Sequence, residues 1–251
     1  MNINENRKRR IYWNGRIINL DLNRPEVERL PYKHIEVFNE IWQQKRIRTP
    51  LLILIGGYAG TGKSTVARAI IEEVNYTSVL ATGFIRSFVQ SIHKPENEPA
   101  LSMNTYDLHR LNSNSDNPGE IIEAFKRQRY LVAEGIENAA KFVVTEHQHT
   151  IVDGNHVSPD CAERVAKLDG LIPISFYVKV SDADTHRQMI SGPTHSRILD
   201  DGQFRTARIL HDFMVREVED QNFPIFEYNE ASSRALEMID QALVPIVSPY
   251  L

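Results

Sequence analysis

The chain has 251 residues, of which 41% are hydrophobic and 25% are charged, a composition typical of a globular protein. Its formal net charge of -4 at pH 7 argues against a general nucleic-acid-binding protein, although a local basic cleft stays open. Cys161 is the single cysteine, which excludes an intramolecular disulfide and a cysteine-rich zinc site and fits a reducing compartment. No apolar run approaches ~20 residues and the first ten residues are polar, so we expect a cytoplasmic protein without a signal peptide.

The first elements predicted in chain order are a β-hairpin and a helix. Residues 11–18 surround Asn14-Gly15, the preferred pair for a two-residue type I′ turn. Residues 31–45 follow as a helix with one apolar face, formed by Ile35, Phe38, Ile41 and Trp42. We interpret residues 1–48 as an appendage packed on a main domain of residues 49–251.

In the main domain, predicted strands alternate with predicted helices. Strands are expected at residues 51–55, 78–81, 150–154, 174–180 and 224–226, and helices at 66–74, 84–92, 118–147, 182–191, 204–221 and 230–243. Residues 93–102 are expected to form a proline-containing loop, and residues 192–203 a mobile loop rich in Gly, Pro, Asp and Ser. This alternation predicts an α/β fold, a mostly parallel sheet with helices on both faces.

Residues 57–64, which follow the first predicted strand, fit the phosphate-binding pattern G-x-x-x-x-G-K-[ST]. A strand, a glycine-rich loop and a helix occur in the order that phosphate binding requires, and the helix N-terminus adds partial positive charge. Lys63 would contact the β- and γ-phosphates of ATP, and Ser64 would bind Mg²⁺. The alternative is a turn that binds nothing. The candidate nucleotide-binding residues are Gly57, Ala59, Gly60, Thr61, Gly62, Lys63, Ser64 and Thr65.

Three polar residues follow other predicted strands at the same edge of the sheet. Asp153 ends an apolar strand and would hold Mg²⁺ directly or through water, unless it only forms an Asp-Gly turn. Arg86 would clamp a carboxylate or phosphate of the acceptor, or it is an exposed helix arginine. His156 would face the same cleft, where it would bind substrate or cap the turn.

Four arginines surround the expected mobile loop: Arg187, Arg197, Arg205 and Arg208. Taken singly, each is more often a surface arginine. As a set they predict a lid near residues 192–205 that closes over ATP, with Arg197 or Arg208 stabilising the transferred phosphoryl group. His147 and His149 would suit a metal ion, but no third ligand is near in sequence, so we interpret them as a solvated helix end.

Six segments between about residue 51 and residue 228 carry a further pattern. They are residues 56–65, 82–86, 102–106, 135–137, 151–157 and 204–224. Together they resemble the 2-phosphoglycerate kinase family of P-loop small-molecule kinases. The resemblance implies Mg²⁺-dependent transfer of the γ-phosphate of ATP to a hydroxyl of a small phosphorylated hydroxy acid. As a hypothesis for the mechanism, we assign catalytic roles to Lys63, Asp153, Arg197 and Arg208, and substrate-binding roles to Arg86, Tyr106 and His156.

Two departures from that family bear on the acceptor. The family motif has Thr-Asp before the arginine, whereas this chain has Thr82-Gly83, and glycine cannot orient or deprotonate a hydroxyl. Members that act on 2-phosphoglycerate also often carry an N-terminal nucleotide-binding regulatory domain, for which residues 1–48 are too short. The chain is similar as well to the archaeal mevalonate 3-phosphate 5-kinase branch of isoprenoid synthesis. Mevalonate 3-phosphate is therefore the favoured acceptor and 2-phosphoglycerate the alternative. A loose transition state needs no strong base, and if a base takes part, Asp153 or Asp107 is the candidate.

Other classes of protein fit less well. A nucleotide switch lacks support because no Asn-Lys-x-Asp motif occurs and Asp116-Asn117-Pro118-Gly119 lies in a predicted loop. A motor or transporter subunit would carry a Leu-Ser-Gly-Gly-Gln signature, which is also absent. The acidic charge balance disfavours a kinase that acts on nucleic-acid ends. We expect a small phosphorylated acid as partner, neither nucleic acid nor membrane, and a homodimer stays open.

Overall fold

A computed structural model describes residues 8–13, 16–21, 31–75, 77–93, 97–111, 117–191 and 198–251. Its centre is a parallel five-stranded sheet of order β4-β5-β3-β6-β7. The strands are β3 (Leu51–Gly56), β4 (Ser78–Ala81), β5 (Thr150–Gly154), β6 (Ile172–Lys179) and β7 (Ile225–Glu227). The central strand β3 is buried along its whole length, which explains its uninterrupted apolar sequence. The expected α/β fold is confirmed.

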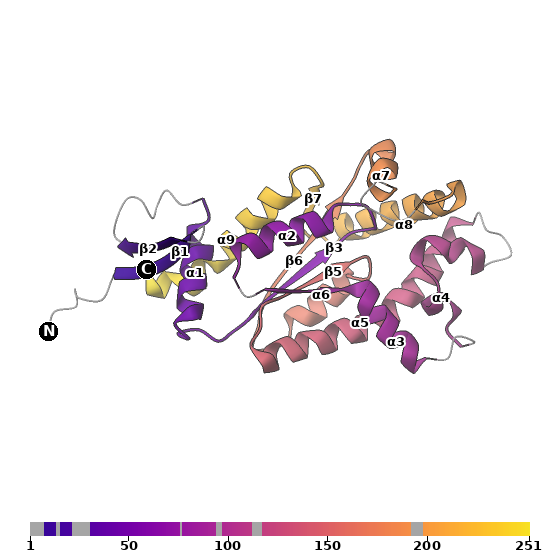
Figure 1. Ribbon diagram of the computed structural model, residues 1–251. Helices are drawn as coiled ribbons and strands as arrows, with labels where there is room; N and C mark the ends of the chain where they lie inside the picture. Colours follow the sequence, from indigo (N-terminus) through magenta and orange to yellow (C-terminus); the bar gives the residue numbers. More distant parts are fainter. Residues whose placement is uncertain are drawn as a thin grey trace.

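Helices cover both faces of the sheet, as Figure 1 shows for α2 and α9 on one side and α5 and α6 on the other. One face carries α1 (Lys33–Gln43), α2 (Lys63–Glu73) and α9 (Ala231–Val247); the other carries α3 (Thr82–Ile92), α5 (Pro118–Glu146) and α6 (Pro159–Ala166). Side chains alternate along β3, so Ile53 and Ile55 pack in the first core cluster and Leu52 and Leu54 in the second.

A third core cluster supports the loop that follows β3. It joins α4 (Pro99–Ser102), the 3₁₀ helix η2 (Thr105–Leu111), α7 (Ala183–Ile190) and α8 (Asp201–Asp220) around Tyr58. Phe125 of α5 and Leu210 of α8 are fully buried in the same cluster. The carboxyl edge of the sheet is therefore backed by packed side chains on the side of α8 and η2.

The N-terminal elements are β1 (Lys8–Trp13) and β2 (Arg16–Asp21), which pair antiparallel with Trp13 opposite Arg16. The predicted hairpin strands are confirmed, and the two turn residues between them lie outside the described residues. Helix α1 packs against α9, and its Ile35 and Phe38 are fully buried in the first core cluster together with residues of β3. The second half of the expected appendage therefore shares its core with the main sheet.

Most of the predicted strands and helices are confirmed, but several short elements differ from the prediction. The segment expected as a loop at residues 93–102 contains α4, and α6 was not predicted. Residues 192–197 lie outside the described residues, and residues 201–203 belong to α8, which begins with an Asp200–Gln203 capping box instead of a mobile loop.

The interpretation of His147 and His149 as a solvated helix end was wrong for His149, whose side chain is only 1% exposed. The remaining short helix at the carboxyl end of the chain is η3 (Ser248–Tyr250). Among the described helices, none combines the length and the apolarity that a membrane span requires.

Candidate active site

The phosphate-binding loop connects β3 to α2 through residues 57–62. Gly57, Gly60 and Gly62 have φ angles of 135°, 78° and 84°, in the left-handed region that favours glycine. A Cβ on Gly60 would also lie 2.7 Å from the Cβ of Ile190 in α7. The backbone conformation therefore favours glycine at all three positions, and the close approach of α7 adds a steric requirement at Gly60.

Lys63 is the first residue of α2, and its side chain is buried over the loop. The ammonium donates to the carbonyl of Tyr58 at 2.6 Å, and the hydroxyl of Thr61 donates to the same carbonyl at 2.9 Å. Burial lowers the pKa of Lys63 to about 8, against the opposing effect of the Asp153 carboxylate. A phosphate would supply the anionic partner that a desolvated ammonium needs.

Asp153 lies beside the loop because β5 pairs with β3 in a register that sets Asp153 opposite Ile55. Its side chain is 8% exposed, and burial raises the pKa of the carboxyl, while the nearby Lys63 ammonium lowers it. No cluster of three or more His, Cys, Asp or Glu side chains suitable for a metal occurs in the described part of the chain. A Mg²⁺ ion would therefore rely on Ser64, Asp153, phosphate oxygens and water, a donor set that suits this ion.

A cavity of about 320 Å³ opens beside the loop. It is lined on the nucleotide side by Lys63, Ser64 and Asp153, and on the other side by Arg86, Tyr106 and His156. With Ala59 and Gly60, which also line it, the cavity brings together eight predicted site residues from four segments of the chain. The cavity also exposes Thr82, Asn104, Thr105 and Asn155, which were not predicted.

Arg86 organises one wall of this cavity. Its guanidinium donates to the carbonyls of Leu101 and Met103, and to Oδ1 of Asn104 at 3.2 Å. These bonds hold the turn between α4 and η2 against α3, which brings Asn104 and the following Tyr106 to the cavity. Arg86 is therefore a structural element of the acceptor wall as well as a candidate ligand for an anion.

His156 lines the cavity, but both of its ring nitrogens are hydrogen-bonded. Nδ1 lies 3.0 Å from Oγ1 of Thr82, and Nε2 lies 3.0 Å from Oε1 of Gln128. The amide nitrogen of Gln128 donates to main-chain carbonyls of Ala100 and Met103, so its oxygen accepts from the His156 Nε2–H. Burial lowers the pKa of His156 to about 3. The neutral ring therefore orients the hydroxyl of Thr82, a buried residue in the wall of the cavity.

The lid arginines are placed differently from their predicted position. Arg197 lies outside the described residues, and Arg208 does not line the cavity. The Arg208 guanidinium donates to the Val180 carbonyl at 3.0 Å and to the Asp212 carboxylate at 2.7 Å. It also lies 3.3 Å from Nδ1 of His186, a buried residue that the sequence analysis did not single out.

The fold and the geometry of the site together define the class of protein to which this chain belongs. A central parallel strand leads into a glycine-rich loop with a buried lysine, a carboxylate ends the neighbouring strand, and a polar cavity adjoins both. This is the arrangement of a P-loop nucleotide-binding protein.

Comparison with known proteins narrows that class, although no family model matches the chain. A 2-phosphoglycerate kinase of Methanopyrus kandleri is 25% identical over 241 residues, covering 92% of this chain and 71% of the relative. Proteins of the same name from Methanocaldococcus jannaschii and Pyrococcus horikoshii are each 24% identical, covering 82% and 90% of this chain and 69% and 79% of their own lengths. The chain is therefore a small-molecule kinase, a phosphotransferase with an alcohol group as acceptor.

Proposed function

We propose that the protein transfers the γ-phosphate of ATP to the free hydroxyl of 2-phosphoglycerate. The observation that carries this proposal is one cavity shared by the nucleotide residues Lys63 and Ser64 and the acceptor residues Arg86 and Tyr106. The names of the relatives support 2-phosphoglycerate over the mevalonate 3-phosphate that the sequence analysis favoured. The acceptor carries a carboxylate and a phosphate, which suits a wall that contains a guanidinium.

On the nucleotide side, the backbone N–H groups of residues 57–64 surround the phosphates, and Lys63 contacts the β- and γ-oxygens. Ser64 and Asp153 hold Mg²⁺, which neutralises charge on the phosphate oxygens. The buried setting of Lys63 strengthens its attraction to the transferring group, because little water competes with the phosphate.

On the acceptor side, Arg86 and Tyr106 bind the anionic groups, and His156 fixes the hydroxyl of Thr82 in the cavity wall. The acceptor oxygen forms a bond to the γ-phosphorus, the bond from that phosphorus to ADP breaks, and the hydroxyl proton is released. A loose transition state depends mainly on position and charge neutralisation, so a glycine at position 83 is compatible with turnover. Asp107, one candidate base, does not line the cavity and accepts from Gln203 at 2.9 Å.

The test is ATP consumption with Mg²⁺ against 2-phosphoglycerate, mevalonate 3-phosphate, mevalonate and glycerate, with products identified by mass spectrometry. We expect a bisphosphorylated product from 2-phosphoglycerate. Turnover of mevalonate 3-phosphate alone would instead restore the acceptor favoured from the sequence, and ATP hydrolysis without acceptor preference would contradict the proposal.

Lys63→Ala tests the nucleotide side. We expect kcat/KM to fall by about 10³-fold, because this substitution removes a buried charge that contacts the transferred group. The matched control is Lys141→Ala, which truncates an exposed lysine on α5 whose ammonium makes, among the described residues, only a long hydrogen bond to Asn138. Wild-type kinetics in a folded Lys63→Ala variant would overturn the site assignment.

A further inference from the structure

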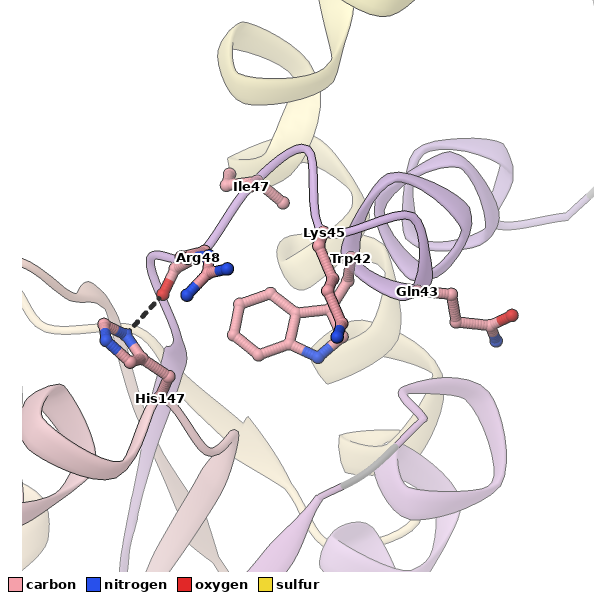
Figure 2. A pocket seen from close by; sticks show the side chains of 6 residues that line it. All are labelled: Trp42, Gln43, Lys45, Ile47, Arg48 and His147. Atoms are coloured by element: carbon pink, nitrogen blue, oxygen red, sulfur yellow. Dashed lines mark hydrogen bonds between the residues drawn. The ribbon is translucent and has the colours of Figure 1, made fainter.

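A second, larger cavity lies at the opposite edge of the sheet from the phosphate loop. It has a volume of about 540 Å³ and lies between the carboxyl ends of α1 and α5 (Figure 2). Its lining residues are Trp42, Gln43, Lys45, Ile47, Arg48 and His147. Strand β3 begins next to this cavity and ends at the phosphate loop, so roughly 17 Å of strand separates the two sites, at about 3.3 Å per residue.

The indole of Trp42 is held in place by two aromatic neighbours. Its ring centroid lies 4.0 Å from that of His149 and 6.2 Å from that of Phe38. Nδ1 of His149 accepts from the Leu51 N–H at 3.0 Å, and burial lowers the pKa of His149 to about 4, so the supporting ring is neutral. Trp42 therefore offers an ordered aromatic surface to the cavity, as Figure 2 shows.

Two cationic side chains accompany this aromatic surface. Lys45 and Arg48 are exposed, and neither forms an ion pair with a carboxylate within the described ranges. Figure 2 shows the guanidinium of Arg48 pointing toward the indole of Trp42. His147 lies on the other side of Arg48 and is hydrogen-bonded through Nδ1 to the Arg48 carbonyl at 3.0 Å. The cavity thus combines an aromatic face with positive charge that has no carboxylate partner among the described residues.

The backbone gives an independent indication. Lys45 and His147 have φ angles of 57° and 51°, in the left-handed region where a helix end usually has glycine. Of the three such residues other than glycine in the described part of the chain, two line this cavity. Both residues end helices, Lys45 after α1 and His147 after α5, so the two helix ends converge at the wall of this cavity.

We propose that this cavity binds a small anion with a planar aromatic body, of which a nucleoside monophosphate is the simplest example. The ring stacks on Trp42, and the phosphate lies between Lys45 and Arg48. Stacking on an aromatic side chain and charge-assisted bonds to a phosphate are the interactions that these residues supply. The volume lies within the range of small-molecule sites.

Fluorescence of Trp42 tests the proposal, because Trp13→Phe leaves Trp42 as the single tryptophan of the chain. In this background, AMP is expected to change the fluorescence saturably. Adenosine lacks the anion and ribose 5-phosphate lacks the ring, so each should bind about tenfold or more weakly. A double variant with Lys45→Gln and Arg48→Gln should bind AMP more weakly by a similar factor. Joint Lys141→Gln and Arg234→Gln substitution, at exposed sites on α5 and α9, should not.

Lys63→Ala separates this site from the phosphate loop. The Trp42 response to AMP should be unchanged in that variant, whether or not the protein phosphorylates 2-phosphoglycerate. Three results would overturn the proposal: no saturable response, equal affinity for AMP and inorganic phosphate, or a response lost in Lys63→Ala.

Discussion

His186 lies with Nε2 at 2.8 Å from the main-chain carbonyl of Ala59, and this hydrogen bond ties α7 to the phosphate loop. Because the partner is a carbonyl, Nε2 is the protonated nitrogen, and Nδ1 accepts from the Arg208 guanidinium at 3.3 Å. Burial lowers the pKa of His186 to about 4, which keeps the ring neutral. Arg208 thus acts on the loop through His186, as a positioning residue.

Replacing His186 should therefore weaken nucleotide binding more than it slows chemistry. His186→Ala leaves the Ala59 carbonyl without its donor, and we expect KM for ATP to rise about tenfold with a smaller change in kcat. His186→Asn keeps an N–H donor and should recover part of the loss. Steady-state kinetics at varied ATP measure both. Equal losses in the Ala and Asn variants would show that the donor is not the cause.

Gly83 offers a gain-of-function test. A Cβ at this position would meet no heavy atom within 4 Å, and the residue lies in the first turn of α3 on the cavity wall. Gly83→Asp should therefore fold normally and gain up to about 1 kcal/mol of stability from helix propensity and the helix dipole.

The same substitution restores the carboxylate that the resembling kinase family has at this position. If that carboxylate orients the acceptor hydroxyl, kcat with 2-phosphoglycerate should rise in Gly83→Asp and stay unchanged in Gly83→Ala. A fall in both variants would instead mean that the acceptor needs the open space at Gly83.

Gly154, at the end of β5, should tolerate no side chain. Its φ angle is 150°, and a Cβ would lie 1.8 Å from Oγ1 of Thr82. Thr82 cannot turn away without losing its bond to His156. We expect Gly154→Ala to lower the free energy of unfolding by about 3 kcal/mol. Urea unfolding measures this loss, and Gly83→Ala is the control at an open position.

Glu36 should make the stability of the protein depend on pH. Burial, and then the nearby Glu73, raise the pKa of the Glu36 carboxyl from 4.5 to about 7. The folded state therefore holds this proton more tightly than the unfolded state, so ionisation of Glu36 destabilises the fold. The cost is absent below pH 4.5 and complete above about pH 7.

Glu36→Gln removes that cost. The variant should be more stable than the wild type by about 3 kcal/mol at pH 8 and lose this advantage toward pH 4.5. Thermal unfolding across this pH range measures the difference. An advantage that is constant with pH would assign the effect to packing rather than to ionisation.

The sequence predicted the parts of the site that have a local signal. The phosphate loop and Asp153 follow apolar strands, so their places at the carboxyl edge of the sheet follow from the parallel topology. The hydrogen bonds from His156 to Thr82 and Gln128 join residues that are 74 and 28 positions apart in the sequence. No sequence spacing predicts that such distant residues are hydrogen-bonded. Arg208 was expected at the transferred phosphoryl group because it follows the expected lid segment closely in the sequence. Its position in the sequence does not show that its side chain points toward His186 and Val180.

Burial was also hard to predict for isolated polar residues. His149 lies three residues after α5 ends, and a histidine in that context is usually solvated. It is buried because α1, from a distant segment, packs Phe38 and Trp42 against it. The short helix α4 was missed because four residues give too little periodicity to recognise, and α6, with eight residues, was missed as well.

The two walls of the candidate active-site cavity adjoin strands that differ in the number of strands they pair with. Strand β3, which carries the phosphate loop, is paired on both sides, whereas β4, which leads directly into α3, is an edge strand paired only with β5. Helix α3 also leaves Phe84, Phe88 and Ile92 more than half exposed. Amide hydrogen exchange should therefore be slowest in β3 and faster in β4 and α3, because edge elements open locally. We therefore expect local opening of the wall that β4 and α3 form to cost less free energy than opening of the phosphate loop.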